Sequence, residues 1–450
     1  MAILKPKFPW CGSDFSTTQG HEGPQRPIRK TSSESFRTMK ILVLNSGSST
    51  QKTALFDIES AASSEPVAPL WEGKLEWDGE NENLTVRNGR GKQVREEKEC
   101  KSKDRCFSVE KMIQMVWSGP AAVLSGANEV DMIGHRIVHG GAKLEEPVVI
   151  DARVKQAIAE VAEIAPLHNK AGLEGIETAE KLFSGKKQVA VFDTGFHRTM
   201  PDYAFTYPGR YEWLERGIRR YGFHGINHQY CGHRAAHMLQ REVDSVKVVS
   251  CHLGNGCSLA AIDGGKSVNT TMGFTPLDGV MMGTRGGEID PGILVHLMRK
   301  DGCGANELDD LLNRHSGLLG ISGVSSDMRD VVEASSKGNK RAKLAFEIFV
   351  HRLRTAIAAM AASMGGIDAL VFTAGIGENS VEVRRAACEK LSFLGVQIDS
   401  AKNGAAKPDA DIATPESRVR VLVIRAQEDW SIARECVRLK LNQNVQNSRD

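Results

Sequence analysis

One stretch decides the fold of this chain: Met39-Lys-Ile-Leu-Val-Leu-Asn45-Ser-Gly-Ser-Ser-Thr50-Gln-Lys52-Thr-Ala-Leu-Phe-Asp57. Its first apolar run is short enough for a buried strand, a cluster of small hydroxyl residues with one glycine follows, and a second apolar run comes directly after. This pattern predicts a β-hairpin with a polar tip. The amide of Asn45, the hydroxyls of the tip and the cation of Lys52 suit a phosphate group. The tip is not a Walker A loop, because a strand follows it and the second glycine before the lysine is missing.

The composition narrows the class of protein. With 450 residues, the chain exceeds the length at which a single hydrophobic core stops growing, so we expect two domains. A hydrophobic content of 41%, a charged content of 25% and a net charge of +2 are typical of a soluble globular protein and give no electrostatic reason to expect nucleic acid or membrane as a partner. The nine cysteines form no Cys-x-x-Cys pair, which argues against a zinc ribbon and a disulfide framework. We therefore expect a reducing, cytoplasmic location.

Residues 1–38 lack apolar periodicity, so we expect a mostly disordered extension there. Organelle targeting by this extension is a less favoured alternative, because acidic residues interrupt it and no amphipathic pattern is present. Residues 59–106 are dense in charge and indicate exposed edge strands. Beyond them strands alternate with helices, which predicts an α/β architecture. Strands are expected at residues 130–139, 188–192, 369–373 and 419–424, and helices at residues 109–117, 153–164, 170–182 and 430–441 and from about residue 381.

The sequence pattern of the opening hairpin is repeated once in the second half of the chain. Residues 246–263 again read as a strand, a small polar tip with Gly254, Asn255 and Gly256, and a second strand. Two halves of the chain are thus expected to carry one phosphate-facing hairpin each. A third glycine-rich turn, at residues 375–379, follows a strand and precedes a helix, where backbone N–H groups could hold a nucleotide.

Three charged residues stand in places that need an explanation. Asp193 ends an apolar strand, where it either displays a catalytic carboxylate or only caps a turn. Arg136 lies inside an apolar strand-like stretch, an unfavourable place for a guanidinium unless an anion pairs with it. A small carboxylate substrate would satisfy it, and so would an internal Asp or Glu. Arg285 is flanked by glycines and is typical of an anion clamp on a loop.

Three histidine pairs have the spacing i, i+4, which on a helix can bind a metal ion. The pair at 135 and 139 lies on strand-like sequence, the pair at 224 and 228 is interrupted by Gly225, and the pair at 233 and 237 lacks the glutamate of a His-Glu-x-x-His motif. A histidine metal site is therefore not expected.

The chain resembles the acetate kinase family of the acetate and sugar kinase, heat-shock protein and actin superfamily. The likeness extends from Met39 to about Leu441. It rests on these strings, in family order: Asn45-Ser-Gly-Ser-Ser, Gly134-His-Arg-Ile-Val-His-Gly-Gly, Ala165-Pro-Leu-His168-Asn, Val191-Phe-Asp193-Thr, Arg220-Tyr-Gly-Phe-His224-Gly, His252-Leu-Gly-Asn-Gly256, Met272-Gly-Phe-Thr-Pro276, Met282-Gly-Thr-Arg285, Ser325-Ser-Asp327-Met-Arg329-Asp and Phe372-Thr-Ala-Gly-Ile-Gly-Glu-Asn379.

The resemblance implies a two-domain, actin-like ATPase fold of the ribonuclease H type, with a mixed sheet flanked by helices in each domain and the active site in the cleft between them. It implies an N-terminal domain of residues 39–194 plus 430–446 and a C-terminal nucleotide-binding domain of residues 195–429. It also implies ATP-dependent, reversible phosphorylation of acetate to acetyl phosphate, with Mg²⁺ (or Mn²⁺ in its place), ATP and ADP as co-substrates, and a homodimer.

The resemblance also assigns roles to residues. Those implied to act in catalysis are Asp193, His224, Arg285 and His168. Those implied to bind the substrate are Arg136, which would take the carboxylate, and Val138, Leu167, Phe223 and Pro276 around its methyl group. Those implied to bind the nucleotide are Lys52, His252, Leu253, Gly254, Asn255, Gly256, Asp327, Met328, Arg329, Gly375, Ile376, Gly377, Glu378 and Asn379. Those implied to hold Mg²⁺ are Asn45 and Glu428.

Elementary chemistry agrees with these roles. In-line phosphoryl transfer needs positioning and positive charge around the equatorial oxygens more than covalent chemistry. Because acetate is already ionised at pH 7, Asp193 need not act as a base, and a positioning role is favoured. One departure from the family pattern is Ala426-Gln-Glu-Asp429, which keeps the ligand carboxylate but changes its neighbours.

Three alternatives stay open. The acid could be propionate or butyrate, since one methylene is worth only ~1–3 kcal/mol in such a pocket. The chain could be an actin-like ATPase switch without acyl transfer, although such a switch has no need of the carboxylate pocket at Arg136. Pyrophosphate could replace ATP, although the segments at 327–329 and 375–377 favour adenosine.

Overall fold

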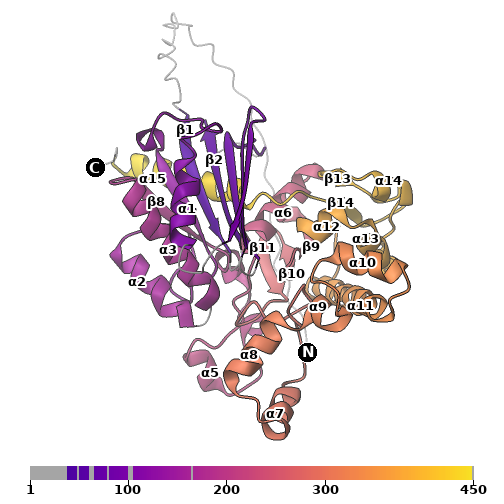
Figure 1. Cartoon of the computed structure of the whole chain (residues 1–450). Helices are drawn as coiled ribbons and strands as arrows, with labels where there is room; N and C mark the ends of the chain where they lie inside the picture. Colours follow the sequence, from indigo (N-terminus) through magenta and orange to yellow (C-terminus); the bar gives the residue numbers. More distant parts are fainter. Residues whose placement is uncertain are drawn as a thin grey trace, which may run out of the picture. The chain divides into compact units, whose positions relative to one another are not determined.

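Two mixed β-sheets and their helices form the part of the chain that the computed structural model describes (Figure 1). The described residues are 38–47, 50–59, 65–78, 81–99, 105–163 and 166–447. Ser48 and Ser49 of the predicted hairpin tip lie outside the described residues, and so does the expected N-terminal extension as far as residue 37.

The first sheet is built around the predicted hairpin, which is confirmed. Strand β1 (Met39–Ser46) pairs antiparallel with β2 (Thr50–Ile58) and parallel with β6 (Met132–Ile137). The whole order is β5-β4-β3-β2-β1-β6-β8-β7. The other strands of this sheet are β3 (Trp71–Asp78), β4 (Asn81–Asn88), β5 (Gln93–Glu99), β7 (Val148–Val149) and β8 (Lys187–Phe192).

The second sheet is built around the second predicted hairpin, at residues 246–263, which is also confirmed. Strand β9 (Lys247–Leu253) pairs antiparallel with β10 (Cys257–Asp263) and parallel with β12 (Ala369–Thr373). The order is β11-β10-β9-β12-β14-β13. The other strands are β11 (Lys266–Thr270), β13 (Ala410–Asp411) and β14 (Arg420–Val423).

The two sheets share one plan. The run β3-β2-β1-β6-β8 and the run β11-β10-β9-β12-β14 both consist of two antiparallel pairings followed by two parallel ones. The internal repeat seen in the sequence is therefore a repeat of topology. Because the parallel strands of each sheet end at one edge, polar residues that follow them gather there.

Helices cover both sheets. Two of them, α6 (Gly225–Met238) and α15 (Glu428–Asn447), share a hydrophobic cluster with residues of both sheets, and the ring of Tyr230 meets that of Trp430 edge to face at 5.9 Å. The other helices are α1 (Arg105–Gln114), α2 (Ala152–Glu160), α3 (Pro166–Leu182), α4 (Asp202–Phe205), α5 (Tyr211–Glu215), α7 (Pro291–Lys300), α8 (Ala305–Arg314), α9 (Gly317–Ser322), α10 (Met328–Ser336), α11 (Lys340–Ser363), α12 (Ala374–Asn379), α13 (Val381–Cys388) and α14 (Ser400–Ala405).

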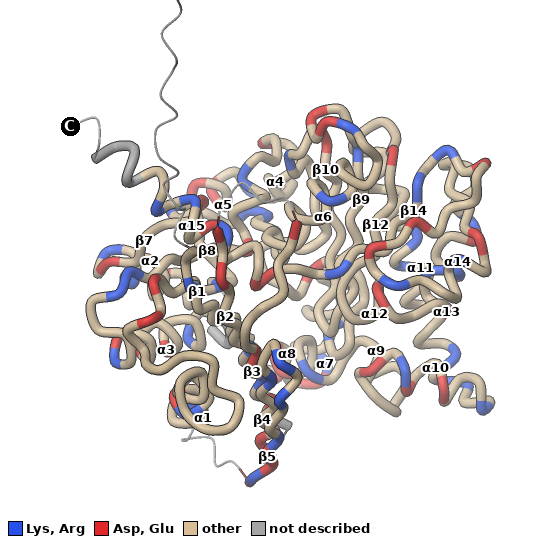
Figure 2. Tube along the Cα trace, turned by 90° about the horizontal axis from the view of Figure 1, so that it is seen from above, with Lys and Arg blue, Asp and Glu red and all other residues tan. Residues whose placement is uncertain are grey.

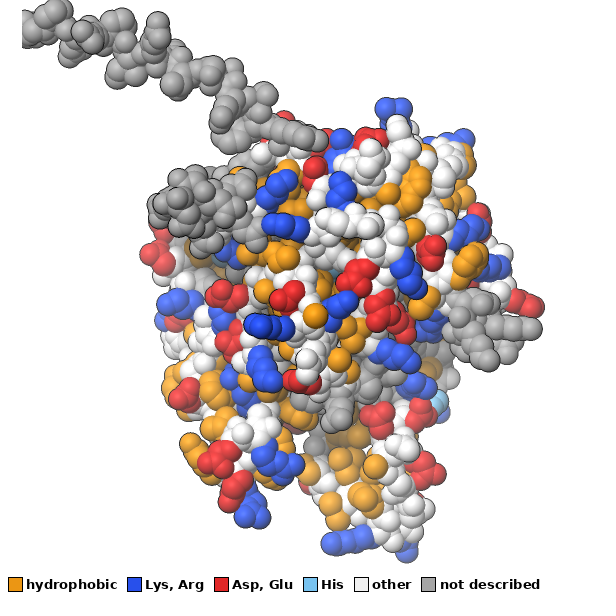
Figure 3. Space-filling view, turned by 90° about the vertical axis from the view of Figure 1, so that its left-hand side faces the viewer, with side chains coloured by type: hydrophobic (Ala, Val, Ile, Leu, Met, Phe, Trp, Pro, Cys, Tyr) orange, Lys and Arg blue, Asp and Glu red, His pale blue; other side chains and the backbone are white. Residues whose placement is uncertain are grey.

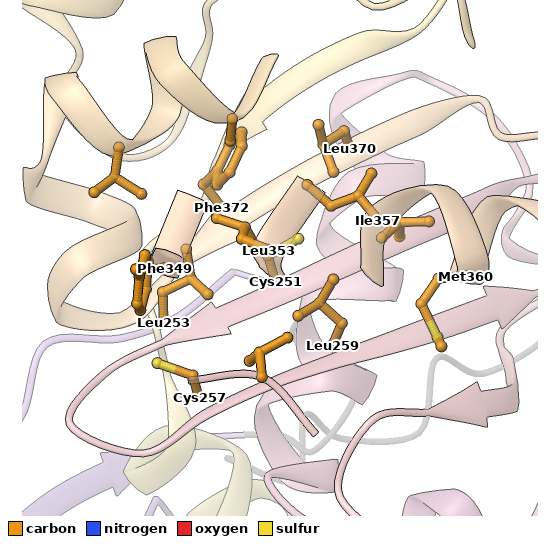
Figure 4. Close-up of a cluster of buried hydrophobic side chains, with 14 of the residues drawn as sticks. Cys251, Leu253, Cys257, Leu259, Phe349, Leu353, Ile357, Met360, Leu370 and Phe372 are labelled. Carbon is orange, nitrogen blue, oxygen red and sulfur yellow. The ribbon is translucent and has the colours of Figure 1, made fainter. Parts of the chain in front are cut away.

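The core of the second sheet lies under the long helix α11. Side chains of α11, including Phe349 and Leu353, point toward Leu253, Leu259 and Phe372 of the strands (Figure 4). All five are buried. Burial of a side chain of this size contributes about 1.5–3 kcal/mol, so this layer holds the strands that carry the His252 to Gly256 turn.

Several predicted boundaries were wrong by a few residues. Helix α1 begins at Arg105 rather than at 109, and α3 begins at Pro166 rather than at 170. Proline is tolerated in the first turn of a helix, because no intrahelical hydrogen bond needs its missing N–H. Helix α15 begins at Glu428 rather than at 430, so that residue and Asp429 form its first turn.

The surface mixes charges of both signs. Basic and acidic residues are mixed along β3, β4 and β5 (Figure 2), and β5 is the exposed edge strand of the sheet. Acidic and basic side chains are also interspersed over the face in Figure 3. Within the described residues, no helix has both the length and the apolar character that a membrane crossing requires.

Candidate active site

The carboxyl ends of three parallel strands bring the first site residues together. In the register of the sheet, Asn45 of β1 stands beside Arg136 of β6, and Arg136 stands beside Val191 of β8. Asp193 follows the end of β8. The side chains of Asn45, Arg136 and Asp193 therefore meet at one edge of the first sheet, as residues at the ends of neighbouring parallel strands do.

Arg136 and Asp193 form a buried ion pair. The guanidinium donates from Nε to both carboxylate oxygens, at 3.1 and 3.0 Å, and from Nη2 to Oδ2 at 2.6 Å. The Asp193 side chain is fully buried, and that of Arg136 is 14% exposed. Burial opposes the charge of Arg136, but Asp193 and Glu428 hold the pKa of the guanidinium above its ordinary value. The sequence left two partners open for Arg136, a carboxylate substrate or an internal Asp or Glu. The structure shows an internal partner, Asp193.

Asn45 joins this pair to the start of α15. Its Oδ1 accepts a hydrogen bond from Arg136 Nη1 at 3.1 Å, and its Nδ2 donates to Glu428 Oε2 at 3.3 Å and to Asp429 Oδ1 at 2.7 Å. Burial opposes the charge of Glu428, but Arg136, with His252 and Lys52, holds its pKa at about 2. Burial raises the pKa of Asp429. The Glu428 carboxylate is thus ionised and available to a cation.

These side chains fit a hard divalent cation. Carboxylate and amide oxygens are the protein ligands that Mg²⁺ prefers, usually only one or two of them with water completing the shell. Glu428 and Asp429 offer two half-buried carboxylates side by side. Asn45 offers its oxygen to Arg136 in this structure, so direct metal ligation by Asn45 needs its amide to turn over. Within the described residues no group of three or more His, Cys, Asp or Glu side chains is placed to hold a metal ion.

His224 lies where the two sheets' site residues meet. It adopts a left-handed backbone conformation (φ 57°, ψ 22°) directly before α6, which is uncommon for a residue with a side chain and is a frequent sign of a functional position. A Cβ atom at the next residue, Gly225, would lie 2.2 Å from the carbonyl oxygen of Asp193. Glycine therefore allows α6 to start against Asp193, which brings His224 beside the ion pair.

The rings of His224 and His252 stack on each other. Their centroids lie 4.0 Å apart and their planes differ by 10°. Burial lowers the pKa of His252 to about 4, and burial together with His252, Arg136 and Arg285 lowers the pKa of His224 well below its ordinary value. Both imidazoles are therefore neutral at pH 7 and offer N–H donors instead of a positive charge.

Arg285 is a half-buried cation without an acidic partner among the described residues. Its Nη1 donates to the carbonyl oxygen of Pro276 at 2.9 Å, and within the described residues no carboxylate lies within ion-pair distance. Burial lowers the pKa of this guanidinium. A Cβ atom placed at Gly256 would lie 3.7 Å from Arg285 Nη2 and 3.6 Å from His224 Nε2. Arg285, His224 and the Gly256 turn thus converge on one point, where the unpaired positive charge of Arg285 favours the binding of an anion.

The residues implied to surround the methyl group are only partly assembled by the structure. Val138 and Phe223 are buried in one hydrophobic cluster, and Pro276 is tied to Arg285. Leu167 and His168 lie in the first turn of α3, and their side chains lie outside the described part of the structure.

The residues implied to bind nucleotide come from four segments. Lys52 stands opposite Asn45 across the first hairpin. His252 and Leu253 end β9, and the following glycine-rich turn leads into β10. Asp327 caps α10, with its carboxylate accepting from the N–H of Arg329, and Met328 is buried in the first turn.

The fourth nucleotide segment corrects a prediction. Residues 375–379 do not form an open turn but belong to the short helix α12. Glu378 Oε1 accepts hydrogen bonds from the backbone N–H of Ala374 at 3.0 Å and of Ala426 at 2.9 Å, which closes the turn and ties it to the chain just before α15. Arg384 Nη1 also donates to the carbonyl oxygens of Gly377 and Glu378.

A hollow of about 980 Å³ opens beside this site. Asn45, Lys52, Glu428 and Asp429 contribute to its lining, together with residues of strands β2 to β5 and of the segments 66–69 and 425–427. Arg136, Asp193, His224 and Arg285 do not line it.

Comparison with known proteins places the chain in a family. Residues 40–434 match the acetokinase family. The chain belongs to the acetokinase family. It is 53% identical over 403 residues to the acetate kinase of Cyanothece sp., an alignment that covers 89% of this chain and 98% of that one.

Solved structures of acetokinase-family proteins share the fold. The acetate kinase of Porphyromonas gingivalis superposes with a TM-score of 0.79 at 39% identity, and a propionate kinase of Francisella tularensis subsp. tularensis with a TM-score of 0.79 at 38% identity. Each covers 88% of this chain and 98% of its own. The expected actin-like fold with two mixed sheets is therefore confirmed.

For this acetokinase-family chain, the set of site residues predicted from the sequence was incomplete. Asp429 was treated only as a neighbour of Glu428, yet it shares the Asn45 amide. Asn227 and Ser258 were not singled out, although they contact His252 and His224, and His228, which was considered only as a metal ligand, contacts Ser258. The only signal for them was their position in segments already of interest, since contacts between residues so far apart leave no spacing pattern.

Proposed function

We propose that this chain is an acetate kinase, which transfers the γ-phosphoryl group of ATP reversibly to acetate and forms acetyl phosphate and ADP. The observation that carries the proposal is the convergence of Arg136, Arg285 and His224. A Cβ atom at Gly256 would lie 3.7 Å from Arg285 Nη2 and 3.6 Å from His224 Nε2, and the residue after His224 donates its N–H to the carbonyl oxygen of Asp193, the partner of Arg136. Membership of the acetokinase family supports it.

The arrangement suits phosphoryl transfer. The transition state spreads negative charge over three equatorial oxygens, and enzymes stabilise it with fixed cations and N–H donors. Arg285 would supply a cation with no competing carboxylate among the described residues, and His224 would supply a neutral donor. The backbone N–H groups of Asn255 and Gly256 would hold the phosphates, since that of Gly254 donates to the carbonyl oxygen of Gly256.

Arg136 would bind the carboxylate of the substrate. A guanidinium has five N–H donors, and here the protein uses one on Nε, one on Nη1 and one on Nη2. One donor on each Nη atom has no partner among the described residues, which leaves two N–H groups for a carboxylate. Asp193 would then fix the guanidinium instead of acting as a base, and Val138, Phe223 and Pro276, with Leu167, would enclose the methyl group.

Mg²⁺ would bind at Glu428, with Asp429 and Asn45 nearby. Mn²⁺ would serve at the same site in place of Mg²⁺. The cation neutralises charge on the ATP phosphates when it is bound. Glu428 suits this role because its half-buried carboxylate stays ionised. Lys52 would approach the phosphates from the first hairpin, and the segments at 327–329 and 375–379 would hold the adenosine.

A propionate kinase remains the second candidate. The Francisella protein, described as a propionate kinase, is as similar in structure as the Porphyromonas acetate kinase, with the same TM-score of 0.79. One methylene in an apolar pocket changes the specificity constant by only ~10–200-fold.

Further properties of the enzyme are proposed from the family. The chain would divide into residues 39–194 plus 430–446 and residues 195–429, each with one sheet, and the two would close over bound nucleotide. A homodimer is also expected. Exposed apolar side chains on neighbouring segments provide a candidate surface: Ile293, Val295 and Met298 of α7, Leu311 of α8 and Ile321 of α9. Light scattering gives the oligomeric state, and X-ray scattering with and without ATP plus acetate tests closure.

Trapping with hydroxylamine tests the function. Purified protein, Mg-ATP, acetate and hydroxylamine should give acetyl hydroxamate at a rate proportional to enzyme. Parallel reactions with propionate and butyrate rank the acids, and reactions with pyrophosphate test the donor. Absence of hydroxamate with every acid from two to four carbons would refute the kinase proposal.

A further inference from the structure

The two stacked imidazoles of the site are each held at the ring nitrogen that faces the protein interior. Nδ1 of His252 lies 2.9 Å from the amide nitrogen Nδ2 of Asn227, and Nδ1 of His224 lies 2.9 Å from the hydroxyl oxygen of Ser258. Asn227 and Ser258 are fully buried. These contacts occupy the Nδ1 atom of each ring and leave its Nε2 atom.

The contact with Asn227 fixes the proton of His252. An amide NH₂ group can only donate, so Nδ1 of His252 must accept, and the single proton of the neutral ring lies on Nε2. The same amide nitrogen lies 3.4 Å from Thr373 Oγ1. Asn227 Oδ1 is buried without a hydrogen-bond partner in the described structure. An orphaned buried acceptor costs ~1–3 kcal/mol, so this amide orientation carries an unfavourable term, and the reversed orientation would place the His252 proton on Nδ1.

A longer chain of hydrogen bonds stands behind His224. The hydroxyl oxygen of Ser258 lies 2.9 Å from His224 Nδ1 and 2.8 Å from His228 Nε2. His228 Nδ1 lies 3.0 Å from Ser250 Oγ. The Ser258 hydroxyl has one proton. When His228 donates to Ser258 and Ser258 donates to His224, the proton of His224 lies on Nε2, as it does in His252.

Both Nε2 atoms face the turn that is expected to hold phosphate. A Cβ atom at Gly254 would lie 3.6 Å from His252 Nε2, and one at Gly256 would lie 3.6 Å from His224 Nε2. Glycine at these positions keeps the space in front of the two nitrogens open.

We propose that Asn227, Ser258 and His228 are positioning residues that hold His252 and His224 as matched Nε2–H tautomers, so that the stacked pair presents two neutral donors to the transferring phosphoryl group. The part that concerns the phosphoryl group rests on the proposed function, and the part that concerns the tautomers does not. The two donors are fixed before substrate binds, which makes them effective at a site where charge develops.

Asn227→Asp is the sharpest test, because it keeps the shape and replaces the NH₂ donor by an acceptor. A carboxylate there accepts a proton from Nδ1 of His252, so the tautomer inverts and the pKa of that imidazole rises. Ser258→Ala removes the donor behind His224. Asn306→Asp, on the exposed surface of α8, is the matched control for the added charge.

Nitrogen-15 spectra of labelled histidine in the full chain report the tautomers directly, with His224→Gln and His252→Gln used only to assign the signals. In the unmodified chain, both signals should show protonated Nε2 and bare Nδ1. In Asn227→Asp the His252 signal should change to the Nδ1-protonated or doubly protonated form, and kcat should fall about tenfold or more with the KM for acetate within about twofold. Ser258→Ala should lower kcat with the His252 signal unchanged, and Asn306→Asp should change neither.

Either of two results would overturn the proposal: protonated Nδ1 on His252 in the unmodified chain, or an Asn227→Asp variant that folds and keeps both the spectrum and kcat. If Asn227→Asp does not fold, the unmodified chain's spectrum still decides the tautomers. Since that spectrum requires no turnover, failure of the tautomer assignment and failure of the kinase function are distinguishable.

Discussion

The guanidinium of Arg136 holds the carboxylate of Asp193 through Nε and Nη2, although 57 residues separate the two in the chain. The pair stands at the ends of neighbouring parallel strands, and Asn45 on the third strand completes it. Removing one partner of a buried pair leaves the other charge without compensation, so the pair links stability to substrate binding.

Arg136→Ala is expected to raise the KM for acetate strongly and to destabilise the fold by about 3–5 kcal/mol, because Asp193 stays buried without a partner. Steady-state kinetics and urea unfolding measure the two effects. The double variant Arg136→Ala with Asp193→Asn should recover part of the stability but not the KM. An unchanged KM for acetate in Arg136→Ala would remove the carboxylate-binding role.

Glu428→Gln should raise the concentration of Mg²⁺ needed for half-maximal activity, and Asp429→Asn should do so less, because only Glu428 has a depressed pKa. The same variants test stability against pH. Since the folded pKa of Glu428, about 2, lies below its ordinary value of 4.5, its contribution is present above pH 4.5 and is lost as the pH falls toward 2. Urea midpoints measured from pH 6 to pH 3 should fall less steeply in Glu428→Gln. A parallel slope would show that Glu428 is not held ionised.

The strands and the two hairpins could be predicted from the sequence, because short apolar runs bounded by glycine and hydroxyl residues determine them locally. Helix α12 could not. Its sequence, Ala374-Gly-Ile-Gly-Glu-Asn379, contains two glycines and no helical periodicity. The contact of Glu378 with the N–H of Ala426, 48 residues further along, helps to hold it.

The site could be predicted only as a set of residues. Arg136 was recognised as a cation in need of an anion, but nothing in the spacing identifies Asp193 as its partner. Asn227 and Ser258 contact their histidines across 25 and 34 residues. Such pairs arise when α6 is placed against β9 and β10, and that packing is decided by the whole core.

Arg285→Ala should lower kcat by about 10³-fold or more with a small effect on the KM for acetate, since a cation that acts on the developing phosphoryl charge contributes mainly in the transition state. Arg285→Lys should recover little, because a single ammonium does not reproduce the planar guanidinium. Stopped hydroxamate assays at saturating acetate give kcat. A large rise in the KM with kcat intact would move Arg285 from the reacting group to substrate binding.

Gly225→Ala should destabilise the chain by about 1–3 kcal/mol and lower activity, because its Cβ would lie 2.2 Å from the carbonyl oxygen of Asp193 and would push α6 and His224 away. Gly232→Ala is the control in the same helix. Its Cβ would meet only the Ile262 side chain, at 3.2 Å, and alanine favours the helix by up to about 1 kcal/mol. Thermal unfolding and kcat together check both variants, and equal behaviour of the two would contradict the close approach at Asp193.

Acetate labelled with oxygen-18 in both carboxylate oxygens tests the proposed reaction most directly. With Mg-ATP and enzyme, phosphorus-31 spectra should show acetyl phosphate whose bridging oxygen carries the label, together with unlabelled ADP, because the carboxylate oxygen bound at Arg136 attacks the γ-phosphorus. The Arg136→Ala variant should give far less of this product at the same acetate concentration. Release of inorganic phosphate without labelled acetyl phosphate would contradict phosphoryl transfer to acetate and leave only an ATPase.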